Sequence, residues 1–292
     1  MCRFVLYKGP PLTISSLVTE PTHSLIAQST ASRESEDPLN GDGFGLGWYV
    51  PTLSDQPAVF RSITPAWNNQ NLLDLARVTR SHLILAHVRA ATRGLPVTEL
   101  NCHPFRFGRY LFMHNGDVGG FPAIRRPLLN SLGDDAFNLI RGSTDSEHLF
   151  ALFIDELLRR GEGEGAQRLA DALLAAVHRS RELAQAAGKA EHSYLNVGIA
   201  DGKCAVALRW TSDDPAHASS LYIHTGRKYV CQDGVCAMIQ PEAGQGAVIV
   251  SSERLSDDPG WQSINPNHMV LINEDSSVDF KAADGSTLFT AA

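Results

Sequence analysis

The chain has 292 residues, of which 43% are hydrophobic and 20% are charged, a composition typical of a globular protein with a large core. Its net charge of −7 and its scattered basic residues argue against binding to nucleic acid or to an anionic membrane. Charged residues interrupt each apolar run well short of the ~20 residues that cross a bilayer, and the N-terminus carries no signal-peptide stretch, so we expect a cytoplasmic protein.

Short runs of apolar, β-branched and aromatic residues, bounded by Gly, Pro and Asp, predict strands along most of the chain. These runs cover 2–7, 44–50, 82–88, 110–114, 195–200, 204–210, 220–224, 247–251 and 268–272. Helices are predicted over 71–81, from the capping-box motif at Thr144 to just before Gly161, and over 166–187. Strands, then helices, then strands again favour antiparallel sheets packed face to face and covered by helices, with 161–165 as an interhelical turn.

Five cysteines in a chain without a secretion signal favour reduced thiols over a disulfide framework. Cys231 and Cys236 have no second pair of ligands after them, so the sequence does not favour a zinc site. We expect no metal and no other cofactor.

Cys2 stands directly behind the initiator methionine. A methionine before so small a side chain is normally removed, which would leave a free α-amine and a thiol on one residue. The amine titrates near ~8 and the thiol near ~8.5, so the amine can take the thiol proton directly or through one water. Because any residue can stand second in a chain, the assignment of a nucleophile depends on the other motifs.

Asn115-Gly116 follows the predicted strand 110–114 and combines an amide side chain with an unhindered backbone N–H. Two such donors form an oxyanion hole, and each contributes about 10²–10³ in rate. The alternative is a plain turn, because Asn-Gly is the strongest short hairpin signal.

Two charged residues suit the recognition of an amino-acid head group. Arg89 lies at the end of the predicted strand 82–88, where its guanidinium can hold a carboxylate in two parallel bonds, and a surface ion pair is the alternative. Asp145 lies in the first turn of the helix that follows Thr144. It can pair with a substrate ammonium, or it can only stabilise the N-terminus of the helix through the helix dipole.

The remaining motifs favour structural roles. Cys102 and His103 invite a catalytic or zinc interpretation together with His87 and His114, but these residues lack metal-ligand spacing. A histidine bonded to backbone in a loop is favoured instead. The glycine-rich loop 41–45 precedes a strand rather than a helix, which argues against a phosphate-binding role.

These motifs, in this order behind Cys2, resemble the class II glutamine amidotransferase family. The matching segments are 41–45, 87–92, 101–104, 114–116 and 143–147. A closer resemblance, to the amidotransferase-like subunit of the fungal glutathione-degrading complex, rests on residues 1–4, 63–72 and 142–147. The chain departs from the better-known amidotransferases at Ala90 and Arg93, and nothing after residue 160 resembles a synthase domain. We therefore expect a single domain over residues 1–292.

The resemblance implies the N-terminal-nucleophile hydrolase fold, an α+β four-layer αββα sandwich with two antiparallel sheets. It also implies a role for each matched position. These roles are a nucleophile at Cys2 with its α-amine as base, an oxyanion hole at Asn115 and Gly116, a carboxylate site at Arg89 and Thr92, an ammonium site at Asp145, and a substrate-contacting loop at Gly43.

The same resemblance implies a γ-glutamyl amide hydrolase that cleaves glutathione through a γ-glutamyl thioester, with a metallopeptidase-like partner subunit. Glutamine and glutathione share the γ-glutamyl head and differ in the amine that leaves. The alternatives are a glutaminase or amidotransferase subunit that feeds a synthetase partner, and a γ-glutamyl hydrolase of ergothioneine biosynthesis. A non-catalytic γ-glutamyl-binding module is an alternative of another class.

Overall fold

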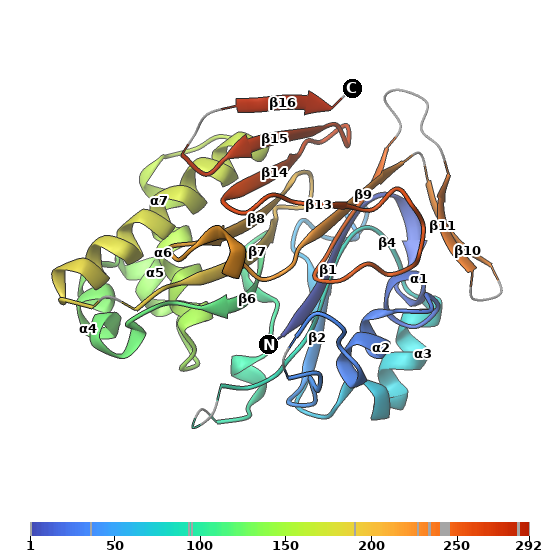
Figure 1. Ribbon diagram of the computed structural model, residues 1–292, viewed down its shortest axis with the longest axis horizontal. Helices are drawn as coiled ribbons and strands as arrows, with labels where there is room; N and C mark the ends of the chain where they lie inside the picture. The colour runs from blue at the N-terminus through green and yellow to red at the C-terminus, as the bar shows by residue number, and fades with distance from the viewer. Residues whose placement is uncertain are drawn as a thin grey trace.

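Two antiparallel sheets of seven strands each face one another across the centre of the molecule (Figure 1). The computed structural model describes residues 2–35, 37–92, 94, 96–189, 191–226, 228–232, 235–239, 246–284 and 287–291. The first sheet has the order β13 (Gln262–Ser263), β9 (Tyr222–Gly226), β12 (Ala247–Ser251), β1 (Arg3–Thr13), β4 (Arg80–Val88), β2 (Phe44–Trp48) and β3 (Ala58–Ser62). The second has the order β16 (Thr287–Ala291), β15 (Val278–Ala282), β14 (His268–Ile272), β8 (Ala205–Thr211), β7 (Tyr194–Ala200), β6 (Tyr110–Asp117) and β5 (Phe105–Phe107).

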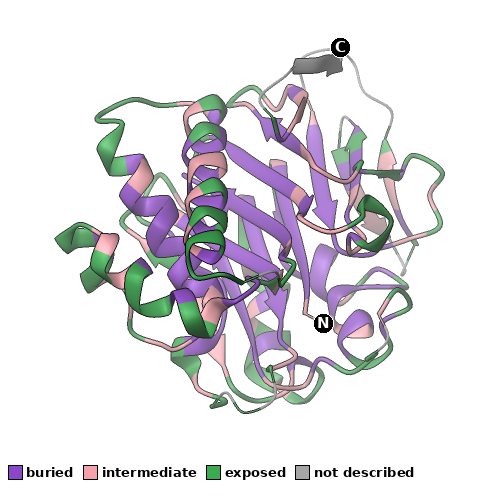
Figure 2. Cartoon of the chain, turned by 60° about the vertical axis from the view of Figure 1, so that its left-hand side comes forward, coloured by how far each residue is buried: buried purple, intermediate pink, exposed green. Residues whose placement is uncertain are grey.

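Helices cover the outer face of each sheet (Figures 1 and 2). The first sheet carries α1 (Ser15–Val18), α2 (Leu25–Thr30) and α3 (Gln70–Val78), while the second carries α4 (Phe121–Ser131), α5 (Asp134–Asn138), α6 (Asp145–Arg159) and α7 (Ala166–Ala186). Short 3₁₀ helices lie at Ala66–Asn68, Glu99–Asn101 and Pro215–His217. This is the four-layer αββα arrangement, so the predicted fold class is confirmed.

Side-chain alternation along β1 explains why this strand lies at the centre of the fold. Val5 and Tyr7 pack toward the helices of the first sheet, whereas Phe4 and Leu6 pack between the two sheets. Successive side chains of a strand point to opposite faces, so a strand that is apolar at every position is buried on both sides. β1 consequently begins inside the molecule, and Cys2 precedes its first residue.

The nine predicted strands and three predicted helices all have counterparts in the structure. The helix predicted over 71–81 ends earlier, at Val78, because β4 starts at Arg80. The capped helix ends at Arg159, and 161–165 separates it from α7 as expected. The sequence did not reveal the short helices α1, α2, α4 and α5, which have too few turns or internal prolines for a clear period.

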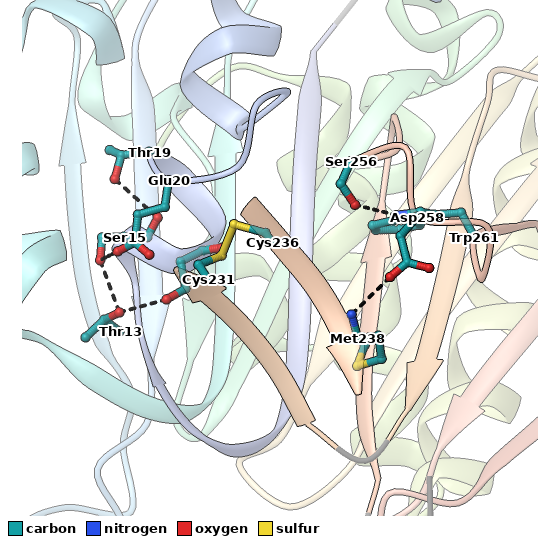
Figure 3. The surroundings of a disulfide bond; sticks show 11 residues. Thr13, Ser15, Thr19, Glu20, Cys231, Cys236, Met238, Ser256, Asp258 and Trp261 are labelled. Atoms are coloured by element: carbon teal, nitrogen blue, oxygen red, sulfur yellow. Dashed lines mark hydrogen bonds between the residues drawn. A yellow bond between two sulfur atoms is a disulfide. The ribbon is translucent and has the colours of Figure 1, made fainter. Parts of the chain in front are cut away.

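The expectation of reduced thiols is wrong at Cys231 and Cys236, which form a disulfide (Figure 3). The two residues lie opposite one another on the hairpin strands β10 (Lys228–Gln232) and β11 (Val235–Ile239), with their Cα atoms 4.1 Å apart. Direct cross-strand pairing therefore brings the sulfurs together. Cys2, Cys102 and Cys204 are free thiols. In the described parts of the chain, no helix is long and apolar enough to cross a membrane.

Candidate active site

Cys2 opens onto a cavity of about 200 Å³ between the ends of β1, β4 and β6. Six residues assigned from the sequence line this cavity, namely Cys2, Arg89, Thr92, Asn115, Gly116 and Asp145. The structure therefore brings together side chains that are up to 143 positions apart in the chain, from Cys2 to Asp145. Gly43 is not among the lining residues.

The thiol of Cys2 is held by the backbone of the residue after Arg89. The Ala90 N–H donates to Cys2 Sγ at 3.4 Å, and the thiol lies 3.5 Å from the Ala90 carbonyl oxygen. Burial raises the pKa of the Cys2 thiol, although the Ala90 hydrogen bond and the Arg89 charge oppose this rise. A thiol with a raised pKa is protonated at neutral pH, so it needs a base before it can attack.

Asn115 presents an unsatisfied amide to the cavity. It is 1% exposed, and neither its Nδ2 nor its Oδ1 has a hydrogen-bond partner among the described residues. A buried amide without partners costs about 1–3 kcal/mol, a cost that a bound ligand can remove. Asn115 lies within β6, opposite Asn196 of β7, so the alternative of a plain hairpin turn is wrong.

Gly116, the next residue of β6, has a φ of 150° and leaves no room for a side chain. A Cβ at this position would stand 1.7 Å from the carbonyl oxygen of Tyr194 on the neighbouring strand. Glycine is therefore required by the close approach of β7. Gly116 lines the cavity next to Asn115.

Arg89 places a buried guanidinium at the same cavity. The residue is 3% exposed, and its Nη1 has no partner among the described residues. Its backbone is anchored by the glycine loop, since the Arg89 N–H donates to the Gly43 carbonyl at 2.8 Å and the Asp42 N–H donates to the Arg89 carbonyl at 2.9 Å. Gly43 thus supports Arg89 from behind the cavity, and a Cβ on it would lie 2.7 Å from the Ser62 carbonyl oxygen.

Asp145 begins α6 and is oriented by backbone donors. Its Oδ2 accepts from the Val118 N–H and its Oδ1 from the Ser146 N–H, both at 2.8 Å. Thr144 caps the helix by accepting from the Glu147 N–H at 3.2 Å, as the motif predicts. Asp145 Oδ1 also accepts from the Ser146 hydroxyl at 3.4 Å, whereas Oδ2 keeps a second lone pair that can accept from a ligand ammonium.

Three buried histidines surround the site in the neutral form. Burial lowers the pKa of His87 to about 3, and it lowers the pKa of His103 and His114 as well. The rings of His87 and His103 stack with centroids 4.3 Å apart, and His114 Nδ1 lies 2.9 Å from Ser146 Oγ. Cys102 lies outside the cavity lining, with Sγ 3.5 Å from the Thr98 carbonyl oxygen, and burial raises its pKa to about 11.

Six further polar residues of the lining have no role assigned from the sequence, namely Asp37, Asn101, His103, His114, Thr144 and Ser146. Asn101 links the segment before the cavity to the turn before α6, because its Nδ2 donates to the Pro96 carbonyl at 3.0 Å and its Oδ1 accepts from the Ser143 N–H at 3.0 Å. Asn101 lies in the motif 101–104 together with His103, so the sequence contained a signal for this linking role of Asn101. Asp37 lies in a loop without a recognisable pattern.

The cavity combines a cysteine before the central strand of an αββα sandwich with an unpaired amide and a buried guanidinium. This combination defines the class of N-terminal-nucleophile hydrolases. The chain belongs to the class-II glutamine amidotransferases, whose family model matches residues 14–287. It is therefore an enzyme of the class that acts on γ-glutamyl amide bonds.

Several known proteins are similar to this chain. The probable glutamine amidotransferase DUG3 of Saccharomyces cerevisiae is 40% identical over 294 residues, which cover 94% of this chain and 82% of the yeast protein. A γ-glutamyl-hercynylcysteine sulfoxide hydrolase of Mycolicibacterium smegmatis is 28% identical, with 94% of this chain and 96% of the relative covered. A class-II glutamine aminotransferase domain protein from Silicibacter pomeroyi has a solved structure with a TM-score of 0.66, 28% identity, and coverage of 96% of this chain and 99% of its own.

Proposed function

We propose that this enzyme hydrolyses the γ-glutamyl bond of glutathione through a γ-glutamyl thioester on Cys2. One observation carries the proposal. Cys2, Asn115, Arg89 and Asp145 all line one cavity of about 200 Å³, and the Asn115 amide and the Arg89 Nη1 have no partner among the described residues. A nucleophile, an oxyanion donor, a cation and an anion are the four groups that a γ-glutamyl amide requires.

The substrate head fits the charges of the site. A γ-glutamyl group carries an α-carboxylate and an α-ammonium on one carbon, and its reactive carbonyl lies at the end of the side chain. Arg89 suits the carboxylate because a guanidinium forms two parallel bonds to it, and Thr92 lines the cavity next to Arg89. Asp145 suits the ammonium. This pair of contacts selects the γ-glutamyl head and leaves the departing amine free to vary.

The reaction requires a base for a thiol that burial keeps protonated. In the proposed mechanism, removal of Met1 frees the α-amine of Cys2, which accepts the thiol proton while Sγ attacks the γ-carbonyl carbon. The amide side chain of Asn115 and the N–H of Gly116 stabilise the oxyanion. The C–N bond then breaks, the amine returns the proton to the departing nitrogen, and water hydrolyses the thioester to release glutamate and the thiol.

The comparisons support a γ-glutamyl substrate that carries a cysteine. The mycobacterial relatives are named for hydrolysis of a γ-glutamyl-hercynylcysteine sulfoxide, in which a γ-glutamyl group is joined to a cysteine derivative. Glutathione contains the same linkage, and the yeast relative with 40% identity is similar over most of both chains. The mycobacterial similarity also favours a second candidate, hydrolysis of a γ-glutamyl cysteine derivative other than glutathione. A partner subunit and a cytoplasmic location remain predictions of the sequence resemblance.

Glutamate release separates these candidates. Enzyme whose intact mass shows removal of Met1 should be assayed with glutathione, glutamine and γ-glutamyl-hercynylcysteine sulfoxide, beside a Cys2→Ala control. We expect the highest kcat/KM for glutathione and no glutamate from the control. A preference for the sulfoxide would support the second candidate, and binding without glutamate from any substrate would identify a non-catalytic binding module.

A further inference from the structure

A second and larger cavity, of about 740 Å³, adjoins the catalytic cavity. Asp37 lines both cavities, so they meet at this residue. The second cavity is also lined by Glu34, Arg209, Ser219, Ser220 and Tyr222. We call this cavity the distal groove. Its position beside the reacting centre raises the question of what occupies it during the reaction.

The pairing of strands connects the distal groove to the oxyanion donor. Asn115 of β6 lies opposite Asn196 of β7, and Asn196 lies opposite Arg209 of β8. Residues directly opposite in a sheet share a face, and neighbouring strands are about 4.8 Å apart, so the Arg209 backbone lies about 10 Å from that of Asn115. Asn196 completes the connection by donating from Nδ2 to the Ser220 carbonyl at 2.8 Å.

Arg209 carries a positive charge that is fixed in place but not neutralised. Its Nε donates to the Ser219 carbonyl at 2.8 Å, its Nη1 to the Ile264 carbonyl at 2.6 Å and its Nη2 to the Ala218 carbonyl at 2.9 Å. Among the described residues no carboxylate lies within ion-pair distance of Arg209, although the Glu34 carboxylate is close enough to act on its charge. The bonds to carbonyls and one from Nη1 to the Ser263 hydroxyl use four of the five guanidinium N–H groups, so they hold the half-buried group rigidly and leave one Nη2 N–H for a carboxylate.

The groove carries acidic side chains at its junction with the catalytic cavity and also near Arg209. Asp37 lies at the junction with the catalytic cavity, while both oxygens of Glu34 lie within 3.0 Å of the Tyr222 hydroxyl, which donates to them. Cleavage of a γ-glutamyl peptide turns the departing nitrogen into an ammonium, with a carboxylate at the other end of the leaving peptide. The ammonium would lie beside Asp37 and the carboxylate would point toward Arg209.

The strand spacing between Asn115 and Arg209 suits a leaving dipeptide. Two extended residues span about 7 Å, and a single residue spans only about half of that length. The backbones of Asn115 and Arg209 are two strand spacings apart, about 10 Å, a separation of the same order as an extended dipeptide. Ammonia, the product released from glutamine, would leave the whole groove without contacts.

We propose that the distal groove is the subsite for the leaving dipeptide and that Arg209 binds its terminal carboxylate. The substrates favoured by this subsite are γ-glutamyl dipeptides with a free C-terminal carboxylate. The inference rests on the proposed function for the identity of the head group. It adds a specificity-determining residue on the leaving-group side, about 10 Å from the oxyanion donor.

The test compares glutathione with its C-terminal glycinamide, which differs only in the charge that Arg209 would bind. We expect wild-type enzyme to have a kcat/KM roughly 10- to 100-fold lower for the amide, the usual effect of losing one charge-assisted bond. Arg209→Gln should reduce this ratio toward one, and Arg209→Lys should restore part of it. The matched control is Arg168→Gln, another half-buried arginine that donates to the Leu157 carbonyl but lines a different cavity, and it should keep the wild-type ratio.

Equal use of the acid and the amide by wild type would overturn the proposal, as would a ratio that persists in Arg209→Gln. A binding measurement makes the outcome independent of turnover and of the folding of the Arg209 variants. Calorimetry on full-length Cys2→Ala should show S-methylcysteinylglycine binding at least tenfold more tightly than its glycinamide form. Absence of glutamate from every substrate would refute the proposed function alone, whereas equal or absent binding of the two dipeptides would refute the subsite.

Discussion

Arg3 and Glu253 form an ion pair of 2.8 Å behind the nucleophile, and each side chain is 1% exposed. The same guanidinium donates from Nη1 to the Cys2 carbonyl at 2.9 Å. Glu253 in turn accepts from the backbone N–H groups of Arg33 and Glu34, at the start of the loop that carries Asp37. A buried charge cluster therefore fixes both Cys2 and one wall of the cavity.

Replacing Glu253 with Gln should destabilise the fold by about 3–5 kcal/mol, because it leaves the buried Arg3 without a counter-charge. The free energy of unfolding in urea is the measurement. The matched control is Asp74→Asn, which removes an exposed pair with Arg77 and should change stability by no more than about 0.5 kcal/mol. Equal effects of the two substitutions would contradict the buried role of Glu253.

The same cluster should make stability depend on acid pH. Burial opposes ionisation of Glu253, but hydrogen bonds from His23, Ser32 and the backbone outweigh it and hold the pKa of its carboxyl well below the usual range. A carboxyl with a depressed pKa stabilises the fold above its unfolded value of about 4.3, and this contribution is lost as the pH falls toward the folded value. Unfolding free energies measured from pH 6 downward should therefore fall less steeply in Glu253→Gln than in wild type.

Replacing Asn115 with Ala should lower kcat by about 10²–10³ and leave KM nearly unchanged, because the oxyanion exists only in the transition state and the tetrahedral intermediate. Steady-state glutamate release with saturating substrate gives both constants. A kcat equal to that of wild type would mean that the unpaired Asn115 amide has no part in the chemistry.

Arg89 and Asp145 should recognise opposite charges on one substrate carbon. Arg89→Ala and Asp145→Ala should each raise KM roughly ten- to hundredfold, and to a similar extent for glutamine and glutathione. A γ-glutamyl analogue without the α-amine should bind wild type more weakly but lose little further on Asp145→Ala. Additive losses in this double cycle would assign Asp145 to helix capping alone.

The pH profile of the reaction should distinguish an amine base from a histidine base. The free amine must be neutral to accept the thiol proton, so kcat/KM should rise with pH through a single ionisation near ~8. Burial lowers the pKa of His87 to about 3 and also lowers the pKa of His103 and of His114, so it disfavours the charged form of all three rings. A rising limb near pH 6.5 would point to a histidine base instead.

The sequence predicted those parts of the site that lie at the ends of strongly patterned elements. Arg89 follows an apolar strand, Asn115 lies near the end of another, and Asp145 follows a helix cap, so the sequence indicated their local structure but not their proximity in space. Glu253 was not recognisable, because its partner Arg3 is 250 positions away and Glu253 itself belongs to no motif. Long-range pairs of this kind leave no periodic signal in a single sequence.

The distal groove and the disulfide show the same limit. Arg209 lies in a strand whose pattern predicts burial, and only the register with Asn196 places it near the catalytic cavity. Cys231 and Cys236 are five positions apart, a separation that becomes a direct cross-strand pair only when β10 and β11 form a hairpin. Strand register, which depends on tertiary packing, decided both outcomes.

Alkylation by a γ-glutamyl diazo ketone tests the central claim most directly, since the reagent carries the recognised head group and reacts with the attacking thiol. Peptide mass mapping of protein shown to lack Met1 should find the label on Cys2 alone, with none on Cys102, whose thiol has a pKa raised to about 11 by burial. Free glutamate should protect Cys2 from the reagent. Labelling of Cys102 in place of Cys2, or equal labelling of protein that retains Met1, would contradict the account.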